Sequence, residues 1–328
     1  MSERPLLSVR NLSKIFGARA TGVRAVNDVS FDIGAGETFA VVGESGCGKS
    51  TLGRCITQLE KPSAGEVWFG KADLAQLDSA GMRAMRRDIQ MIFQDPYASL
   101  NPRKTVGATL AEPMRIHRLY PRAEWRQRVA EVLAEVGLAP DHADRFPHEF
   151  SGGQRQRISI ARALTLRPSL IVADEAVSAL DVSVQSQVLN LMTELQKTYG
   201  IAYLFISHDL GVVQHVSDRV GVMYLGRMVE RAETAALFRA PMHPYTRSLL
   251  SAVPKMGRRQ NRDREILQGE LPSPLRPPSG CTFHPRCPLR QDRCMSEIPT
   301  LREVAPGRHV ACHFPLADQK PEPAINAA

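Results

Sequence analysis

The stretch Gly43-Glu44-Ser45-Gly46-Cys47-Gly48-Lys49-Ser50-Thr51 decides the fold of this chain. It fits the pattern G-x-x-x-x-G-K-[ST], whose glycines let successive backbone N–H groups point at nucleotide phosphates. Residues 39–42 precede it as a buried strand would, and residues 50–59 follow it as a helix would. Lys49 adds a positive charge near the β and γ phosphates, and the Ser50 hydroxyl is placed to ligate Mg²⁺. A glycine-rich turn without a ligand is the alternative, and the strand-loop-helix context argues against it.

The composition predicts a sizeable core and excludes an obvious membrane span. The chain has 328 residues, of which 43% are hydrophobic, and this suffices for one large domain with an appendage. No apolar run approaches the ~18 residues of a transmembrane helix, and the N-terminal segment lacks the apolar core of a signal peptide. The net charge of +8 permits contact with anionic lipid or nucleic acid and requires neither. We therefore expect a cytoplasmic protein.

The order of predicted elements indicates an α/β fold. Strands are expected at 6–9, 29–33, 66–69 and 89–93, and a mostly helical stretch at about 104–166. Residues 170–230 alternate strands with helices, which predicts a parallel sheet covered on both sides. In such sheets a nucleotide binds at the carboxyl ends of the strands.

Two further motifs carry chemistry. The apolar run 170–173 leads to two adjacent acids, Asp174 and Glu175. Asp174 can hold Mg²⁺ opposite Ser50, and Glu175 can polarise an attacking water as a general base. The segment Ser151-Gly152-Gly153-Gln154 precedes a helical pattern, and a helix N-terminus is itself an anion site. A plain helix cap would not explain why a second phosphate-binding element occurs beside the first.

The ordered motifs GESGCGKST, HEFSGGQRQR, LIVADE, SALD and FISHDL resemble those of ABC-type ATP-binding subunits over roughly residues 6–240. The resemblance implies a P-loop NTPase core with a mixed sheet, an antiparallel β subdomain and a helical subdomain at about 95–166. It also implies that two subunits pack head to tail, so that the phosphate loop of one faces the SGGQ helix of the other across ATP.

The resemblance assigns a role to each matching position. Gly43 through Thr51 would cradle the phosphates, and Ser151, Gly152, Gly153 and Gln154 would close on the nucleotide of the other subunit. Gln94 would contact Mg²⁺ and the attacking water, with His208 at the γ-phosphate and Glu175 as general base. Asp181 would contact the opposite subunit. Phe16 is the candidate for stacking on adenine, although a lone aromatic near a strand is more often part of a core.

A second resemblance covers the C-terminal part of the chain. The segments 94–103, 241–246 and 280–288 look like those of the ATP-binding subunits of dipeptide and oligopeptide importers, a group that also serves nickel and glutathione. It implies a transport-coupled ATPase at the cytoplasmic face of the cell (inner) membrane. Its partners would be a second, different ATPase subunit, two membrane permease subunits and an extracytoplasmic solute-binding protein, with no nucleic acid.

Four cysteines cluster near the C-terminus with the spacing C-x5-C-x6-C-x17-C, namely Cys281, Cys287, Cys294 and Cys312. A cytosolic protein seldom uses such residues for disulfides, so metal binding is the first hypothesis. The spacing leaves open a zinc ion, an iron–sulfur cluster or free thiols, with His284, His309 and His313 as alternative zinc ligands. The resemblance to peptide importers favours a [4Fe-4S] cluster. Cys47, in the phosphate loop, is expected either to be a tolerated small residue or to have a lowered thiol pKa.

We therefore expect an ATP-binding domain over residues 6–240, a C-terminal region with the four-cysteine site over 241–316, and a disordered tail over 317–328. The basic run at 255–264 is interpreted as a solvated linker, with a lipid-binding patch as the alternative. Two other function classes fit the sequence less well. An ABC ATPase acting on ribosomes or DNA usually has two cores or a long coiled coil, and a small-molecule kinase has no use for the SGGQ motif.

Overall fold

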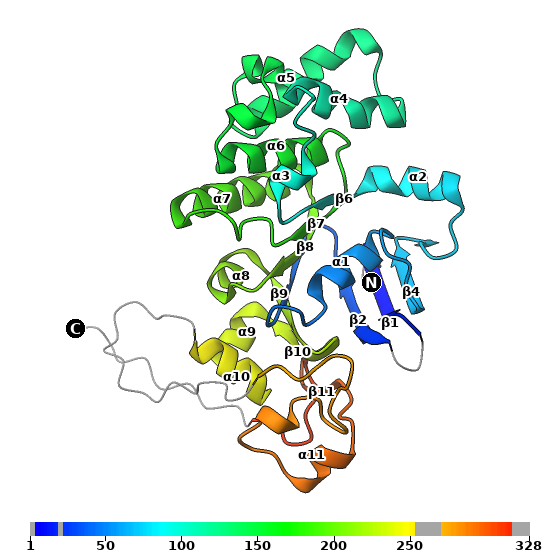
Figure 1. The fold of residues 1–328 in the computed structure, drawn as a ribbon, viewed down its shortest axis with the longest axis vertical. Helices are drawn as coiled ribbons and strands as arrows, with labels where there is room; N and C mark the ends of the chain where they lie inside the picture. The colour runs from blue at the N-terminus through cyan, green and yellow to red at the C-terminus, as the bar shows by residue number, and fades with distance from the viewer. Residues whose placement is uncertain (1–3, 19–21, 253–269, 317–328) are drawn as a thin grey trace, which may run out of the picture.

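Two β-sheets organise the computed structural model, which describes residues 4–18, 22–252 and 270–316 (Figure 1). The basic run at 255–264 and the tail at 317–328 lie outside the described residues. The helices α3 to α6 form one end of the molecule, and the C-terminal region forms the other (Figure 1). The mixed α/β class expected from the sequence is confirmed, with an antiparallel sheet and a helical part beside the main sheet.

The larger sheet has eight strands in the order β11-β12-β10-β9-β3-β8-β7-β6. Its inner strands pair in parallel, β3 with β8 and β9, and β7 with β6 and β8. The strands beyond β9 pair antiparallel. The bounds are β3 (Thr38–Val42), β6 (Ile89–Ile92), β7 (Leu170–Asp174), β8 (Ala202–Ser207), β9 (Arg219–Tyr224), β10 (Arg227–Glu233), β11 (Arg302–Ala305) and β12 (Arg308–Val310).

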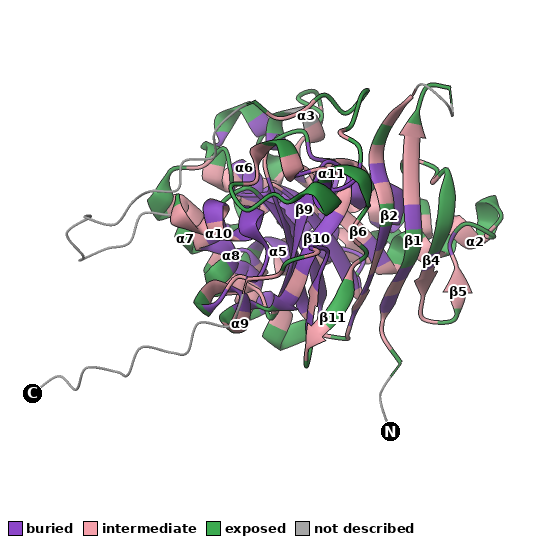
Figure 2. Ribbon diagram, turned by 90° about the horizontal axis from the view of Figure 1, so that it is seen from below, coloured by how far each residue is buried: buried purple, intermediate pink, exposed green. Residues whose placement is uncertain are grey.

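The central strands of this sheet are buried on both faces. Every residue of β3, β7 and β8 is buried, and the middle of the molecule is mostly purple, the colour of buried residues, in Figure 2. Continuous apolar runs such as Phe39–Val42 suit this position because helices or a second sheet cover each face. The carboxyl ends of β3 and β7 lead directly into the phosphate loop and the adjacent acids.

The smaller sheet is antiparallel and has the order β2-β1-β4-β5. Its strands are β1 (Leu7–Phe16), β2 (Val23–Ile33), β4 (Ala64–Phe69) and β5 (Ala72–Asp73). Alternate residues of β2 such as Val29, Phe31 and Ile33 are fully buried, and Phe31 stacks on Phe39 of the main sheet at 4.6 Å between ring centroids. This period of two is what a sheet with one buried face requires.

The helices fill the connections between strands. Their bounds are α1 (Lys49–Ile56), α2 (Ser79–Asp88), α3 (Pro96–Ser99), α4 (Val106–His117), α5 (Trp125–Glu135), α6 (Gly152–Leu164), α7 (Val182–Tyr199), α8 (Leu210–Val216), α9 (Thr234–Arg239), α10 (Pro244–Ser251) and α11 (Asp292–Ser296). Short 3₁₀ turns are η1 (Arg122–Glu124), η2 (Pro140–Asp144), η3 (Pro147–Glu149) and η4 (His284–Arg286).

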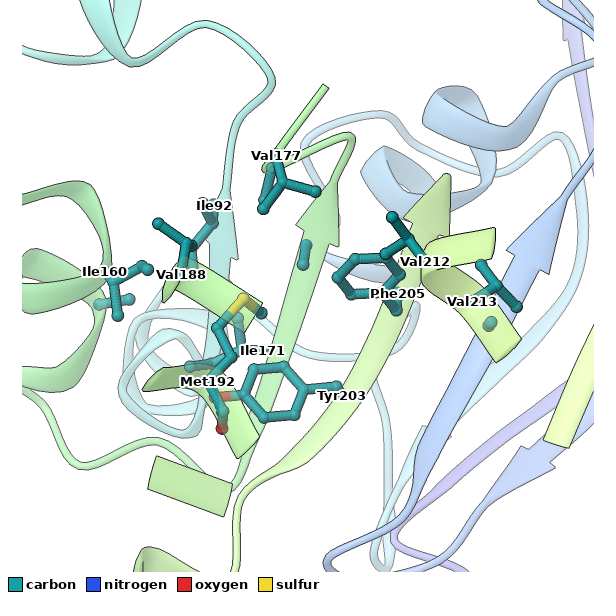
Figure 3. Packing of buried hydrophobic residues seen from close by; sticks show 14 of the residues in the cluster. Ile92, Ile160, Ile171, Val177, Val188, Met192, Tyr203, Phe205, Val212 and Val213 are labelled. Carbon is teal, nitrogen blue, oxygen red and sulfur yellow. The ribbon is translucent and has the colours of Figure 1, made fainter. Parts of the chain in front are cut away.

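Helix α7 packs on the sheet through apolar side chains spaced one helical turn apart. Val188 and Met192 of α7 lie against Ile171 and Tyr203 of the sheet, as Figure 3 shows. Gly200 ends α7 with φ of 66°, a left-handed conformation that glycine adopts at little cost.

The C-terminal region is joined to the main sheet by strand pairing, which the sequence did not reveal. Strand β12 pairs with β10 through Glu230↔Val310 and Arg231↔His309. Glu230 is 1% exposed and accepts hydrogen bonds from the backbone N–H groups of Met242 and His243, each at 2.8 Å. Burial raises the pKa of the Glu230 carboxyl, and these bonds oppose that shift. The main sheet thus includes β11 and β12, which follow the predicted domain boundary at residue 240. The boundary between the two domains stays a prediction.

Candidate nucleotide site

The phosphate loop connects β3 to α1, and its shape requires glycine at two of its positions. Gly43 and Gly48 have φ of 154° and 105°. A Cβ at Gly48 would lie 1.9 Å from the Ala25 carbonyl oxygen, and one at Gly43 would lie 2.3 Å from that of Met223. Any side chain would therefore collide with backbone, which explains the glycines of the motif physically.

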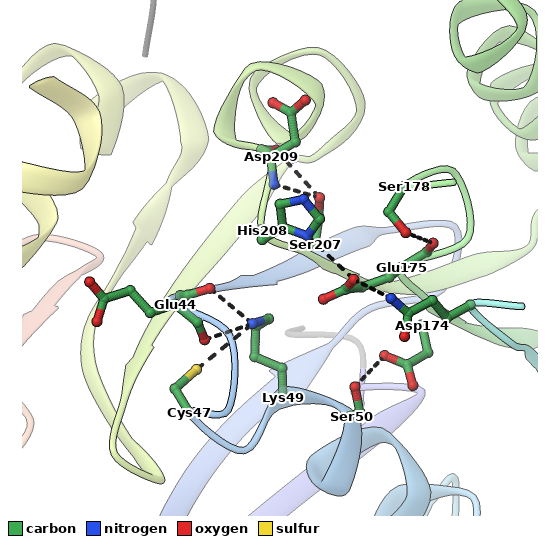
Figure 4. A network of polar contacts seen from close by, with 12 residues as sticks. Glu44, Cys47, Lys49, Ser50, Asp174, Glu175, Ser178, Ser207, His208 and Asp209 are labelled. Carbon is green, nitrogen blue, oxygen red and sulfur yellow. Dashed lines mark hydrogen bonds and ion pairs between the residues drawn. The ribbon is translucent and has the colours of Figure 1, made fainter. Parts of the chain in front are cut away.

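Lys49 is held beneath the loop. Its side chain is 4% exposed, and Nζ donates to the carbonyl oxygens of Gly43 at 2.9 Å and Glu44 at 3.1 Å (Figure 4). The ammonium group is thus fixed at the centre of the loop by two backbone acceptors. This position suits a charge that neutralises phosphate oxygens, as the sequence predicted.

Ser50 and Asp174 meet across the site from different elements. Ser50 Oγ at the start of α1 donates to Asp174 Oδ1 at the end of β7, at 2.8 Å (Figure 4). Burial raises the pKa of the Asp174 carboxyl, and the Ser50 hydroxyl opposes that shift. A hydroxyl and a carboxylate are hard oxygen ligands, so this pair fits Mg²⁺.

Glu175 lies at the centre of a second group of contacts. Its Oε2 accepts a hydrogen bond from Gln94 Nε2 at 2.8 Å and lies 3.3 Å from His208 Nδ1. Its φ is 48°, in the left-handed region, and its backbone N–H donates to the Ile206 carbonyl oxygen at 2.9 Å. A non-glycine residue held at such a φ is typical of functional sites, because neighbouring contacts must stabilise it. The three predicted catalytic side chains therefore come together from β6, β7 and β8.

A cavity of about 240 Å³ lies beside these groups. It is lined by Ser45 to Thr51 together with Gln94 and Glu175. Arg24 and Pro274 also line the cavity, and no sequence motif marks either residue as part of the site. The cavity lies at the carboxyl edge of the sheet, where the α/β pattern placed a nucleotide.

Phe16 does not line this cavity. Its side chain is 40% exposed, and the Lys14 ammonium lies 4.8 Å from its ring centroid. Adenine stacking by Phe16 stays a prediction.

The SGGQ motif forms the N-terminus of α6 and does not line the cavity beside the phosphate loop. Ser151 Oγ accepts from the Gln154 N–H at 3.3 Å, and Gln154 Oε1 accepts from the Ser151 N–H at 3.1 Å. This is a reciprocal capping box. Asp181 caps α7 through the Val184 N–H at 3.0 Å, which lowers the pKa of its carboxyl. Ser151 and Asp181 are therefore the N-cap residues of α6 and α7.

Cys47 differs from one of the two sequence expectations. Its side chain is 1% exposed, and burial raises the pKa of its thiol although Lys49 lies nearby. Desolvation of the thiolate outweighs the favourable charge, so the expected lowering of its pKa is wrong. The structure supports the other interpretation, a small residue tolerated in the loop.

The four C-terminal cysteines line one pocket together with His284 and His313. All four are free of disulfides. Burial raises the pKa of the thiols of Cys281 and Cys287, and that of Cys312 to about 11. In residues 4–18, 22–252 and 270–316, however, no group of three or more His, Cys, Asp or Glu side chains is arranged to hold a metal ion. His309 does not line the pocket.

Comparisons with known proteins agree with this geometry. Residues 26–178 match the family described as ABC transporter, and residues 229–294 match the oligopeptide/dipeptide transporter C-terminal region. The oligopeptide transport ATP-binding protein AppF of Bacillus subtilis is 52% identical over 323 residues, covering 95% of this chain and 98% of AppF. The chain belongs to the ABC transporter family. Within that family it carries the C-terminal region of the oligopeptide/dipeptide group.

Solved structures support the fold of this ABC-type ATPase. CbiO1 from Clostridium perfringens, part of the cbiONQ transporter complex, superposes with a TM-score of 0.64 at 29% identity and covers 72% of this chain and 91% of CbiO1. The ATP-binding cassette MJ0796, solved as a dimer bound to ADP and Pi, gives 0.64 at 29% identity and covers 70% of this chain and 98% of MJ0796. ATP and Mg²⁺ are thus the ligands of this ABC-type ATPase. Among the described residues, no helix combines the length and hydropathy needed to cross a bilayer.

Proposed function

We propose that this chain is the ATP-hydrolysing subunit of a membrane importer for dipeptides, oligopeptides or a related small solute. The ATPase part of the proposal rests on one observation, the contact of Glu175 with both Gln94 and His208. The solute class is supported by the C-terminal region at 229–294 and by the likeness to AppF over 95% of the chain.

The roles of the side chains follow from their contacts. Lys49 and the loop N–H groups bind the phosphates, and Ser50 with Asp174 holds Mg²⁺, which neutralises charge on the β and γ phosphates. Glu175 accepts the proton of the attacking water. Gln94 and His208, bound to the same carboxylate oxygen of Glu175, orient that oxygen and the water.

A dimer completes the site in this proposal. The SGGQ helix start of α6 does not line the chain's own phosphate-loop cavity, so this helix N-terminus is available to a nucleotide held by another subunit. We infer a head-to-tail pair in which Ser151–Gln154 and Asp181 of each subunit close on the ATP of the other. The second ATPase subunit is proposed to be a different chain.

The remaining partners are two membrane permease subunits and an extracytoplasmic solute-binding protein. The chain is then peripheral, at the cytoplasmic face of the inner membrane. Closure of the ATPase pair moves the permease helices, and hydrolysis resets them. The binding protein and the permeases recognise the solute.

Co-purification tests this proposal directly. A tagged chain is purified from solubilised membranes, and the associated proteins are identified and reconstituted into vesicles with a library of short peptides. We expect two permease subunits, a second ATPase and a peptide-dependent rise in ATP hydrolysis. Recovery with ribosomes or DNA, and without membrane proteins, would contradict the importer function.

We also propose that Cys281, Cys287, Cys294 and Cys312 bind a metal centre, a [4Fe-4S] cluster by preference and zinc as the alternative. Four reduced thiols lining one pocket are the donor set that either group takes. Burial disfavours the thiolates of Cys281, Cys287 and Cys312 by raising their pKa values, and a cationic centre would reverse that balance. Its contribution would be to cross-link a region with few regular elements.

Anaerobic purification distinguishes these alternatives. A cluster gives a broad visible absorbance band with iron and sulfide in equal amounts, and zinc gives a colourless protein with one metal per chain. Replacing Cys294 by serine should remove either signal. Metal-free protein with four titratable thiols would contradict the metal site and leave the transport function untouched.

A further inference from the structure

The C-terminal region contacts the phosphate loop through a partly buried ion pair. Arg286 Nη1 lies 2.8 Å from Glu44 Oε2, and Arg286 Nη2 lies 3.0 Å from Glu44 Oε1. The side chains are 7% and 26% exposed. A two-pronged contact of this kind fixes orientation as well as distance, because both Nη atoms bind the two oxygens of one carboxylate. The two residues are 242 positions apart in the chain.

A second contact holds the same residue by its backbone. The Glu44 N–H donates to the Tyr245 hydroxyl at 3.0 Å. Tyr245 is fully buried, and its ring packs against those of Tyr224 at 4.7 Å and Phe283 at 5.4 Å between centroids. Phe283 immediately precedes η4, the turn that contains Arg286. Glu44 is therefore held at its N–H and at its carboxylate by residues that follow position 240.

Glu44 in turn holds the lysine of the loop. Its carbonyl oxygen accepts one of the two backbone hydrogen bonds of Lys49 Nζ, at 3.1 Å. A displaced Glu44 would therefore also displace an acceptor that fixes the ammonium group. Its carboxylate matters as well, because an unpaired negative charge beside a phosphate-binding loop opposes the binding of an anionic nucleotide.

We propose that Arg286 is a positioning residue of the ATP site, which fixes Glu44 and neutralises its charge so that the phosphate loop binds ATP at full affinity. The C-terminal region thereby becomes part of the nucleotide site in the same chain. The inference rests on the ATP-binding part of the proposed function and is independent of the transported solute.

Arg286→Ala should raise the ATP concentration for half-saturation about tenfold, measured with a fluorescent ATP analogue and as KM for hydrolysis. The kcat should change much less, since Gln94, Glu175 and His208 do not contact Arg286. Arg286→Lys should recover part of the affinity, because an ammonium group keeps the charge and loses the two-pronged geometry.

The double variant separates charge from folding. Glu44→Gln/Arg286→Gln leaves no unpaired charge, so its ATP affinity should lie closer to the unmodified protein than that of Arg286→Ala. Arg290→Ala is the matched control, an exposed arginine four residues further along the chain, and should leave ATP affinity unchanged. Thermal unfolding of each variant shows that the chain is folded. Should Arg286→Ala not fold, Arg286→Gln, which leaves the Glu44 carboxylate unpaired and keeps a longer side chain, carries the test and should weaken ATP binding.

Equal ATP affinity in the unmodified protein and in folded Arg286→Ala would overturn the inference. Lys49→Ala in the same assay tests the nucleotide site itself. If Lys49→Ala loses ATP while Arg286→Ala keeps it, only the role of Arg286 fails. If Lys49→Ala also binds ATP normally, the proposed phosphate site fails.

Discussion

The phosphate loop and the four-cysteine region are two sites of one chain with opposite construction. The loop is anchored between β3 and α1, and its groups already contact one another, as in the Ser50–Asp174 hydrogen bond of 2.8 Å. The cysteines lie on short turns and on α11, line a common pocket, and form no ready metal-binding arrangement in the described part of the chain. A rigid parallel sheet can hold polar groups in position by itself, whereas a region with few regular elements depends on a cross-link.

The sharpest test of the preformed site is Lys49→Ala. Because Lys49 is buried and supplies the central charge of the loop, ATP affinity should fall by about 100-fold or more while the fold remains intact. Isothermal titration with ATP and Mg²⁺ measures this, and far-UV circular dichroism checks the fold. Lys197→Ala, an exposed lysine on α7, is the control and should bind ATP normally. Retained binding in Lys49→Ala would show that the loop is not the phosphate site.

Glu175→Gln separates binding from chemistry. An amide keeps the shape of the side chain and cannot accept the proton, so hydrolysis in the assembled complex should fall by about 10²–10⁴-fold while ATP still binds. The variant should accumulate a closed ATP-bound pair, detectable by size-exclusion chromatography with light scattering. Glu194→Gln, exposed on α7, is the matched control. Hydrolysis at the rate of the unmodified protein would disprove the general-base role.

Cys281→Ser tests whether the C-terminal region depends on the proposed metal cross-link. Loss of the Cys281 thiol should loosen residues 279–316 and raise their rate of cleavage by trypsin about tenfold. The ATP-binding part should stay resistant. Mass spectrometry of timed digests locates the cuts. Cys55→Ser, a buried cysteine outside the pocket, is the control and should not change the cleavage pattern. If Cys281→Ser is cleaved at the same rate as the unmodified protein, the C-terminal region is stable without a cross-link, as the ATP-binding part is.

A test outside both sites is the pH dependence of stability that Cys55 confers. Burial raises the pKa of its thiol from 9.0 to about 11. Between these values the unfolded chain has released this proton and the folded chain retains it. The folded state therefore loses about 2–3 kcal/mol of stability through Cys55 as pH rises across this window. Urea unfolding at pH 8 to 11 measures the loss, and Cys55→Ala should show a shallower decline. If the free energy of unfolding falls equally with pH in both proteins, Cys55 is not the source of the loss.

The sequence predicts the main groups of the candidate nucleotide site because they occur in local motifs. Residues 43–51 contain two glycines at which a Cβ would collide with backbone, followed by the lysine and the hydroxyl of the motif. Asp174 and Glu175 are adjacent in the chain. The buried runs 39–42 and 170–174 then dictate parallel strands, whose carboxyl ends meet at one edge. Arg24 and Pro274 escaped prediction because no local pattern marks a residue that reaches a cavity from another segment.

The thiol of Cys47 shows the limit of local reasoning. Its place at the start of a helix predicts a lowered pKa, yet the pKa is raised because the surrounding fold buries the side chain. Likewise, the pattern of β10 and β12 contains no signal for their mutual pairing, which depends on the path of the chain between them.

The sequence alone determined the chemistry of this protein, since the groups that bind phosphate and activate water occur in contiguous motifs whose spacing is fixed by covalent geometry. Only the tertiary structure decided which distant groups support them. Glu175 receives Gln94 and His208 from neighbouring strands, and Glu44 receives Arg286 across 242 residues. Such pairs depend on how the sheet and the C-terminal region pack, and packing is a property of the whole chain that short patterns do not encode.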